Sequence, residues 1–146
     1  KILITGSSGH LGEALVRTFN ALKYQTIGVD IEPSKFTNRM GSIADRSFVK
    51  SCMQGVDFVI HTATLHKPHV VTHSKQDFID TNITGTLNLL EEATAQSVQS
   101  FVFTSTTSTF GDALVSSNED QAVWVDEKLA PSAKNIYGAT TTMAEE

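Results

Sequence analysis

The sequence predicts an α/β protein in which a doubly wound parallel sheet lies between two layers of helices, three layers (αβα) in all. Several short runs rich in Ile, Val and Phe do not alternate cleanly with polar residues, which is typical of strands covered on both faces. These runs are residues 1–5, 24–31, 56–61 and 100–105. Segments with helical spacing separate them, and a glycine-rich turn joins the first strand to the first helix. Strand and helix in this order form right-handed βαβ units.

The composition fits a single domain over residues 1–146. The chain is 40% hydrophobic and 18% charged, and a chain of this length buries roughly 68–70% of its unfolded surface. The net charge of -5 and the lack of a Lys/Arg cluster exclude nucleic acid and an anionic membrane as expected partners. One cysteine, Cys52, excludes an internal disulfide, and no run reaches the roughly 18 apolar residues of a transmembrane helix. We therefore expect a cytoplasmic protein.

The first strand ends in the turn TGSSGHLG, which opens a predicted helix over residues 10–22. Gly6 lets the chain turn sharply, Gly9 lets the backbone approach a pyrophosphate, and Gly12 lets helix and strand pack closely. Free N–H groups and the positive end of the helix dipole suit phosphates, so the turn predicts a Rossmann-type dinucleotide site. The predicted cofactor residues of this turn are Gly6, Gly9, His10, Leu11 and Gly12. The alternative is a glycine-rich turn without a ligand.

Asp30 closes the second predicted strand, eighteen residues after Gly12. A carboxylate at this place accepts hydrogen bonds from both ribose hydroxyls of an adenosine and repels a 2′-phosphate, so we expect NAD rather than NADP. Lys35 and Arg39 in the following loop argue for the opposite choice, because either side chain is long enough to reach a phosphate. The alternative for Asp30 is a solvated turn residue.

Two further helices are predicted, a short one near 46–54 and a long one over 76–97. The long helix carries two apolar rows: Ile79, Ile83, Leu87 and Leu90 in one, and Phe78, Leu89 and Ala93 in the other. One row can cover the sheet, and the second needs a cover of its own. We expect a homodimer through this helix in the full-length protein. The alternative is an inner helix of a three-layer sandwich.

Taken together, the motifs resemble those of the extended short-chain dehydrogenase/reductases, the NAD-dependent epimerase/dehydratase family. After the spacing Gly6-x-x-Gly9-x-x-Gly12, the segments that match in order are GSIAD (41–45), HTAT (61–64), TNITGT (81–86), FTSTTSTFG (103–111) and YGATT (137–141). The resemblance covers essentially the whole chain. It implies further cofactor residues, which are Ser42, Ile43, Thr62, Ala63, Thr64 and Asn82. Ser42 stands where the family usually has an aspartate, and Asp45 is predicted to be a helix N-cap.

The same resemblance implies the catalytic residues. Tyr137 matches the tyrosine that exchanges a proton with a sugar hydroxyl, and it also borders the cofactor. Thr106, with Ser105 beside it, matches the hydroxyl that orients the reacting oxygen. The alternatives are a packed aromatic residue at a helix start for Tyr137 and a solvated β-edge threonine for Thr106.

Thr141 occupies the catalytic position where the family has a lysine. A free tyrosine has a pKa near 10, and a unit charge about 4 Å away contributes about 4 kcal/mol to its ionisation at an effective dielectric near 20. Threonine supplies only a neutral hydroxyl, so we expect ionisation only at high pH and a rate lower by at least about 10²-fold. Lys128 and Lys134 precede Tyr137 in a loop and are poor substitutes. The alternative is that Thr141 is an introduced residue in an otherwise competent sequence.

Two loops remain open in function. The segment HKPHVVTH places His66, His69 and His73 at i, i+3 and i+7, but it holds no acidic or Cys ligand, so no metal is expected. We expect a loop over the cofactor with His66 or Lys67 facing phosphate or substrate, or plain surface histidines. The polar loop 113–131, with Trp124 and Glu127, is either one wall of the substrate pocket or a solvated connection around one buried Trp.

The resemblance implies an NAD-dependent oxidoreductase or isomerase that acts on a sugar or nucleotide sugar. Epimerisation, dehydration and alcohol oxidation share these residues. Family members usually run to about 300 residues or more, so we expect residues 1–146 to be the cofactor-binding part, truncated at the C-terminal side, with the substrate-binding part absent. The alternatives are a non-catalytic NAD-binding sensor or scaffold and an inactive fragment, both of which Thr141 favours.

Overall fold

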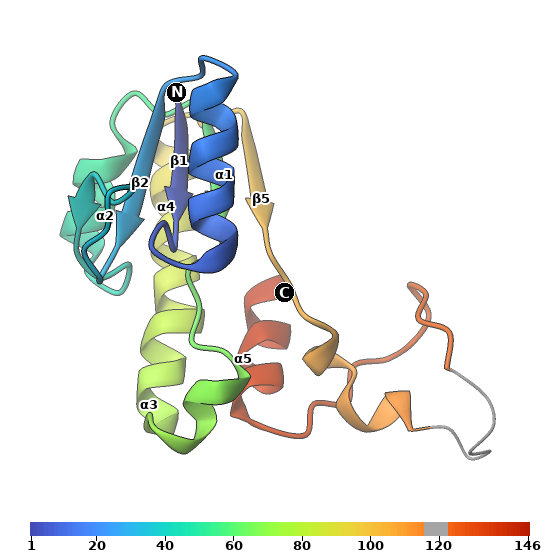
Figure 1. Ribbon diagram of the computed structural model, residues 1–146. Coiled ribbons are helices and arrows are strands. Elements are labelled where there is room, and N and C mark those ends of the chain that lie inside the picture. The colour runs from blue at the N-terminus through green and yellow to red at the C-terminus, as the bar shows by residue number, and fades with distance from the viewer. Residues whose placement is uncertain (116–122) are drawn as a thin grey trace.

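The computed structural model describes residues 1–115 and 123–146, and it confirms the predicted fold class. Its sheet holds five parallel strands in the order β3-β2-β1-β4-β5 (Figure 1). The strands are β1 (Ile2–Thr5), β2 (Thr26–Asp30), β3 (Arg39–Met40), β4 (Phe58–His61) and β5 (Ser100–Phe103). Each of the four predicted runs contains one of them. Strand β3 is not predicted by the sequence, because its two residues are too few to show a pattern.

The helical segments follow the predicted order. The α-helices are α1 (His10–Ala21), α2 (Arg46–Met53), α3 (Lys75–Phe78), α4 (Gly85–Ala95) and α5 (Ile136–Glu145). Short 3₁₀ turns are η1 (Lys67–Val71), η3 (Thr107–Thr109) and η4 (Gly111–Leu114), and η2 (Ile79–Thr84) is a π-helix. The predicted long helix over 76–97 is therefore interrupted, because η2 separates α3 from α4.

The core has two halves, one on each face of the sheet. Successive residues of a strand point to opposite faces, so Ile2 and Ile4 of β1 pack against Val16 of α1. Leu3 points the other way, into a larger cluster with Leu89 of α4 and residues of α2. This arrangement confirms the predicted three layers.

The two apolar rows of the long helical segment differ in how far they are exposed. Phe78, Leu89 and Ala93 are buried, and the last two join the core beneath the sheet. Leu87 and Leu90 remain 53% and 40% exposed. In the row that begins at Ile79, three side chains (Ile79, Leu87 and Leu90) are thus exposed, whereas Ile83 is half-buried.

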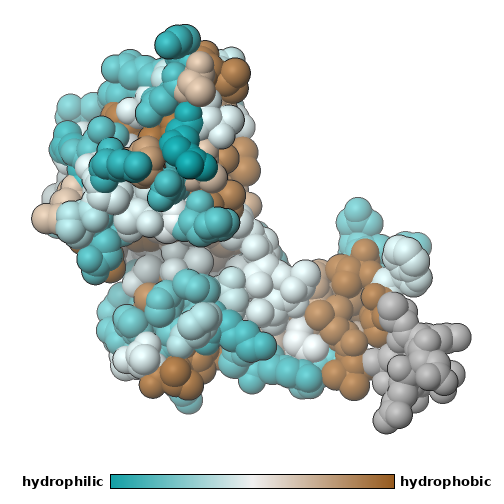
Figure 2. Space-filling model, viewed as in Figure 1, coloured by the Kyte–Doolittle hydropathy of each residue, from teal (hydrophilic) through white to brown (hydrophobic). Residues whose placement is uncertain are grey.

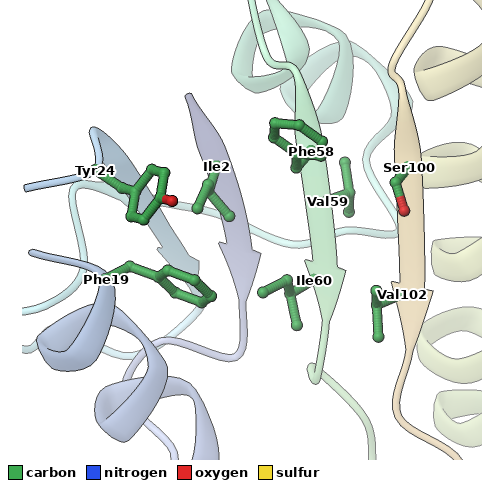
Figure 3. Close-up of a pocket in the computed structure, with 8 residues that line it drawn as sticks. All are labelled: Ile2, Phe19, Tyr24, Phe58, Val59, Ile60, Ser100 and Val102. Carbon is green, nitrogen blue, oxygen red and sulfur yellow. The ribbon is translucent and has the colours of Figure 1, made fainter. Parts of the chain in front are cut away.

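A second uncovered apolar surface lies on the sheet itself, on the face that carries α1. Here a hollow of about 290 Å³ opens beside the end of α1 (Figure 3). Its lining consists of Ile2, Phe19, Tyr24, Phe58, Val59, Ile60, Ser100 and Val102. Phe58 is 40% and Val102 53% exposed, so α1 covers β1 and β2 but leaves much of β4 and β5 open on this face.

The segment between β5 and α5 projects from the sheet. Figure 2 shows hydrophobic surface gathered on this projection, where Val115, Trp124 and Val125 are exposed. Trp124 is therefore not the buried residue that one of our two expectations for the loop 113–131 required. Residues 116–122 of that loop lie outside the described residues. Within the described part of the chain, no helix has the length and apolarity needed to cross a membrane.

Candidate active site

The glycine-rich turn between β1 and α1 has the tight geometry that its spacing predicts. Gly6 has a φ of +75°, which L side chains rarely adopt. A Cβ added at Gly12 would lie 2.0 Å from the carbonyl oxygen of Gly6, so only glycine lets α1 approach the turn. A Cβ at Gly9 would meet only that same oxygen, at 3.2 Å, and Gly9 is exposed. The outer side of the turn is therefore open to a ligand.

The N-terminus of α1 faces the same open side. Its N-cap is Gly9, which has no side chain to satisfy the first N–H groups of the helix. His10 and Leu11 begin the helix with exposed side chains. These amides and the helix dipole suit an anionic group placed over the turn.

Asp30 is hydrogen-bonded to this turn. Its Oδ2 accepts a hydrogen bond from the backbone N–H of Ser8 at 2.9 Å, and its Oδ1 accepts one from Glu32 at 3.0 Å. Arg39 and Lys35, the two cations that could bind the 2′-phosphate of NADP, contact other residues. Arg39 donates to Ser51 of α2 at 2.9 Å, and the Lys35 ammonium lies 4.9 Å from the centre of its neighbouring Phe36 ring.

The segment 41–45 lies between β3 and α2. Asp45 is the N-cap of α2 and accepts from the N–H groups of Ser47 and Phe48 at 2.9 and 3.1 Å, as predicted. Ser42 is exposed, and its hydroxyl accepts from Ala44 at 3.1 Å. Ile43 is 5% exposed and belongs to the core, so its predicted place beside an adenine ring stays a prediction.

The chain after β4 lies against the glycine-rich turn. The hydroxyl of Thr62 donates to the carbonyl oxygen of Thr5 at 2.6 Å. A Cβ on Gly6 would meet Thr62 Oγ1 at 2.7 Å and the backbone nitrogen of Ala63 at 2.9 Å. Two segments predicted to contact the cofactor are thus adjacent. Thr64 Oγ1 lies 3.1 Å from Oδ1 of Asn82.

Asn82 joins this loop to the helix that carries Tyr137. The side chain is 3% exposed, and its Oδ1 accepts from the N–H of Leu65 at 2.8 Å. Its Nδ2 donates to the Leu65 carbonyl at 2.9 Å and to Thr140 Oγ1 at 3.0 Å. Asn82 belongs to the π-helix η2, a distortion often found at functional sites. Thr140 is not among the predicted site residues, although its i+3 spacing from Tyr137 puts both on neighbouring parts of one helix face.

Tyr137 and Thr106 come from two elements in close contact. A Cβ on Gly138 would lie 2.3 Å from the carbonyl oxygen of Ser108, so only glycine allows α5 to pack on η3. Gly138 directly follows Tyr137, and Thr106 is the N-cap of η3, where its Oγ1 accepts from Ser108 at 3.2 Å. Tyr137 and Thr106 are both half-buried.

Thr141 faces the protein interior. It is 3% exposed, and its hydroxyl donates to the carbonyl of Tyr137 at 2.9 Å. It therefore offers no charge and no free donor. Lys134, which precedes α5, pairs with Asp112 at 2.9 Å. Lys134 and Lys67 both line a hollow of about 230 Å³ with Thr107, Ser108, Gly111, Leu114 and Asn135.

The histidine-rich segment contains the 3₁₀ turn η1, so His66, His69 and His73 do not lie on one face of an α-helix. His69 Nδ1 accepts from the backbone of His66 at 3.0 Å, and the ring of His69 lies 5.1 Å from that of His73. Partial burial and the neighbouring histidines lower the pKa of His69. Among residues 1–115 and 123–146, no three His, Cys, Asp or Glu side chains are grouped to hold a metal.

The chain is similar in sequence and in fold to known dehydrogenases and epimerases. The chain is 29% identical over 99% of its length to a 3-beta-hydroxysteroid dehydrogenase of Mycolicibacterium neoaurum, 41% of which it spans. A short-chain dehydrogenase/reductase superfamily protein of Agrobacterium tumefaciens with bound NAD superimposes with a TM-score of 0.83 at 27% identity, covering 99% of this chain and 42% of that one.

A UDP-galactose 4-epimerase structure gives a TM-score of 0.83 at 26% identity, with 99% of this chain and 48% of that chain covered. The chain thus spans less than half the length of these relatives. The model of the NAD dependent epimerase/dehydratase family matches residues 2–146, nearly the entire chain. The chain therefore belongs to the NAD dependent epimerase/dehydratase family.

Proposed function

We propose that the chain binds NAD and forms the cofactor-binding part of an oxidoreductase or isomerase that acts on a sugar or nucleotide sugar. The observation that carries the proposal is the Asp30 carboxylate, held on the glycine-rich turn by the N–H of Ser8 at 2.9 Å. It supports the proposal because a carboxylate here could accept from ribose hydroxyls beside the amides that would receive the pyrophosphate. The substrate-binding residues would lie in the longer protein.

The residues present fit NAD. The open face of Gly9 and the first amides of α1, at His10, Leu11 and Gly12, would hold the pyrophosphate. Asp30 would accept from the adenosine ribose, and Ser42 and Ile43 would border the adenine. Thr62, Ala63, Thr64 and Asn82 would line the path toward the nicotinamide. With Arg39 and Lys35 engaged elsewhere, NAD is favoured over NADP.

For catalysis, Tyr137 would take the proton of a sugar hydroxyl, while Thr106 would hydrogen-bond the same oxygen and orient it. Bound NAD supplies the chemistry of hydride acceptance from the carbon that bears this oxygen. The packing of α5 on η3 through Gly138 supports the pairing of the two residues. The similarity to a UDP-galactose 4-epimerase supports a nucleotide sugar as substrate.

The second candidate function is non-catalytic NAD binding, in a sensor or scaffold. The observation that favours it is Thr141, which is buried, neutral and bonded to its own helix. Without the family's lysine at this position, no ammonium group is present there to assist proton transfer at Tyr137, so the chemical step would be slow.

Two experiments on the full-length protein test these functions: the first tests the NAD binding that both require, and the second separates them. The first is NAD titration of the wild type, of Asp30→Ala and of Glu32→Ala, a matched control two residues away. We expect Asp30→Ala to weaken NAD binding by roughly 10-fold or more, since hydrogen bonds to a charged group contribute about 1.5–3 kcal/mol. We also expect the variant to prefer NAD over NADP less strongly than the wild type does. A wild type without saturable NAD binding at millimolar concentration refutes both functions.

The second experiment is NAD reduction or sugar interconversion by Thr141→Lys, tested with a panel of sugars and nucleotide sugars. Ala139→Lys adds the same charge at an exposed position of α5 and is the control. For an enzyme we expect Thr141→Lys to raise turnover by at least about 10²-fold and Ala139→Lys to leave it unchanged. Tight NAD binding without turnover in every variant favours the sensor.

We also propose that the full-length protein is a cytoplasmic homodimer. The exposed row of Ile79 on η2 and Leu87 and Leu90 on α4 supports the dimer, because a row of large apolar side chains along one helical segment is suited to a subunit interface.

A further inference from the structure

A buried histidine connects the two halves of the candidate site. His61 ends β4 and is 1% exposed. Its Nδ1 lies 2.7 Å from Thr5 Oγ1, at the end of β1, and its Nε2 lies 3.0 Å from Thr86 Oγ1 on α4. The rings of Phe101 and Phe103 pack against the imidazole from β5. No charged side chain is among these contacts.

The neighbouring hydrogen bonds determine the tautomer of the ring. The single hydroxyl hydrogen of Thr86 is donated to the carbonyl oxygen of Asn82 at 2.7 Å. Thr86 Oγ1 can then only accept from His61, so Nε2 must carry the hydrogen. Nδ1 is left as an acceptor and receives the hydroxyl hydrogen of Thr5. Burial lowers the pKa of His61 to about 4, in agreement with a neutral ring.

Both ends of this series of bonds reach predicted site residues. At one end, Thr5 Oγ1 accepts from the N–H groups of Thr62 and Ala63, each at 3.2 Å, next to the glycine-rich turn. At the other end, the series reaches the backbone of Asn82, whose side chain binds Thr140 of α5 at 3.0 Å. Every donor in between has one acceptor, so the direction of the whole series is fixed.

We propose that His61 is a positioning residue, which in its neutral Nε2–H form sets the placement of the glycine-rich turn relative to the helix that bears Tyr137. The kinetic importance of this placement rests on the proposed function, whereas the tautomer and the mechanical connection do not. A protonated ring would present a second donor at Nδ1. Thr5 would then have to turn its hydroxyl hydrogen away, and the fixed direction would be lost.

The tautomer is tested on the wild-type full-length protein with ¹⁵N-labelled histidine and NMR, without NAD or substrate. We expect the His61 signals to show a protonated Nε2 and a bare acceptor Nδ1, unchanged from pH 8 to pH 5.5. An Nδ1–H tautomer, or titration near the ordinary value for histidine, overturns the proposal. Since no ligand is present, this result is independent of the proposed function.

The connection is tested by two variants that each keep one half of the ring's bonding. The amide of His61→Asn reaches only the place of Nδ1, beside Thr5, and that of His61→Gln reaches the place of Nε2, beside Thr86. We expect His61→Asn to keep NAD affinity within about 3-fold while hydrogen exchange of α5 amides speeds up about tenfold, the effect of one lost buried hydrogen bond.

For His61→Gln we expect the reverse pattern, with about tenfold weaker NAD binding and nearly unchanged exchange in α5. Thr86→Val should speed hydrogen exchange of the α5 amides, as His61→Asn does. Thr86→Ser keeps the hydroxyl, so its α5 amides should exchange at the wild-type rate. Equal effects of the two His61 variants on both readouts, or no effect on either, overturn the proposal. If a variant does not fold, the tautomer of His61 measured by NMR in the wild-type protein still tests the proposal.

Discussion

At the scale of single residues, glycines of the same motif have different physical tasks. Gly12 is required by packing, because a Cβ there would lie 2.0 Å from the Gly6 carbonyl oxygen. Gly9 is close to nothing but that oxygen, at 3.2 Å, and its φ of −77° suits any residue. One glycine therefore serves the fold, and the other leaves room for a ligand.

This difference gives a paired prediction. Gly12→Ala should lower the free energy of unfolding by about 1–3 kcal/mol or more, the usual cost of overpacking. Gly9→Ala should change it by less than about 1 kcal/mol but weaken NAD binding, since its methyl group occupies the open side of the turn. Urea denaturation and NAD titration check the two effects. Equal losses of stability would contradict the distinction.

His61 also predicts how stability depends on pH. Its pKa is about 4 in the folded chain against 6.5 for a free histidine, so between these values the unfolded chain binds more protons. Stability that is fully present above pH 6.5 is then lost as the pH falls toward 4. At about 1.36 kcal/mol per unit, the loss from pH 7.5 to pH 4 is about 3 kcal/mol.

The matched variant for this measurement is His61→Gln, which cannot titrate. Urea denaturation at pH 7.5 and pH 4 should show a decrease in stability that is smaller by about 3 kcal/mol in the variant than in the wild type. Carboxylates titrate in both proteins and cancel in the comparison. Identical pH dependence of the two proteins would refute the assignment.

At the scale of elements, the interrupted helix is what brings Asn82 to the site. The π-helix η2 lies between α3 and α4, and Asn82 within it binds both Leu65 and Thr140. Asn88, one turn and a half further on, is also buried, but its amide donates to Ile43 and Ala44 at 3.0 and 3.1 Å. Two asparagines of one helical segment thus hold two different parts of the chain.

Their removal should have separate local effects. Asn82→Ala should cost about 2–4 kcal/mol of stability, because the Leu65 amide and carbonyl lose their partner, and should speed hydrogen exchange in α5. Asn88→Ala is the control, with a comparable loss of stability but faster exchange around residues 42–45. Mass spectrometry of amide exchange distinguishes the two patterns. Faster exchange of α5 in both variants would show that the effect is global.

At the scale of the whole molecule, two of the exposed apolar surfaces, the hollow on the sheet and the helical row, suit partners of different kinds. The hollow beside α1 exposes sheet residues such as Phe58 and Val102, whereas the exposed row of η2 and α4 contains Leu87 and Leu90. Covering a sheet face requires another element of the fold, while a helical row suits a second copy of the chain.

The helical row predicts the effect of Leu90→Glu on the full-length protein. A carboxylate buried without a partner in an apolar interface costs several kcal/mol, so the dissociation constant of the proposed dimer should rise at least about 100-fold. Val71→Glu, at a position 89% exposed and outside the row, should have no effect. Sedimentation velocity measures both. A Leu90→Glu protein that remains dimeric would place the interface elsewhere.

Much of this structure could be predicted from the sequence. The four main strands, the glycine-rich turn, the N-cap Asp45 and the placement of Asp30 at the turn all follow from local patterns. The contribution of Thr140 did not, since a run of three threonines gives no sign of which one meets Asn82. The tautomer of His61 was equally invisible, because its partners are 56 and 25 residues away in the chain.

The sequence by itself determined the fold class, the glycine-rich turn and the absence of a charge at position 141. These are consequences of residue type and near-neighbour spacing, which local sterics and hydrophobic periodicity translate into structure. Only the tertiary structure decided that Thr141 is buried, that Asn82 joins two elements, and that His61 connects β1 to α4. These features depend on distances between segments remote in sequence, which are set when the helices pack on the sheet.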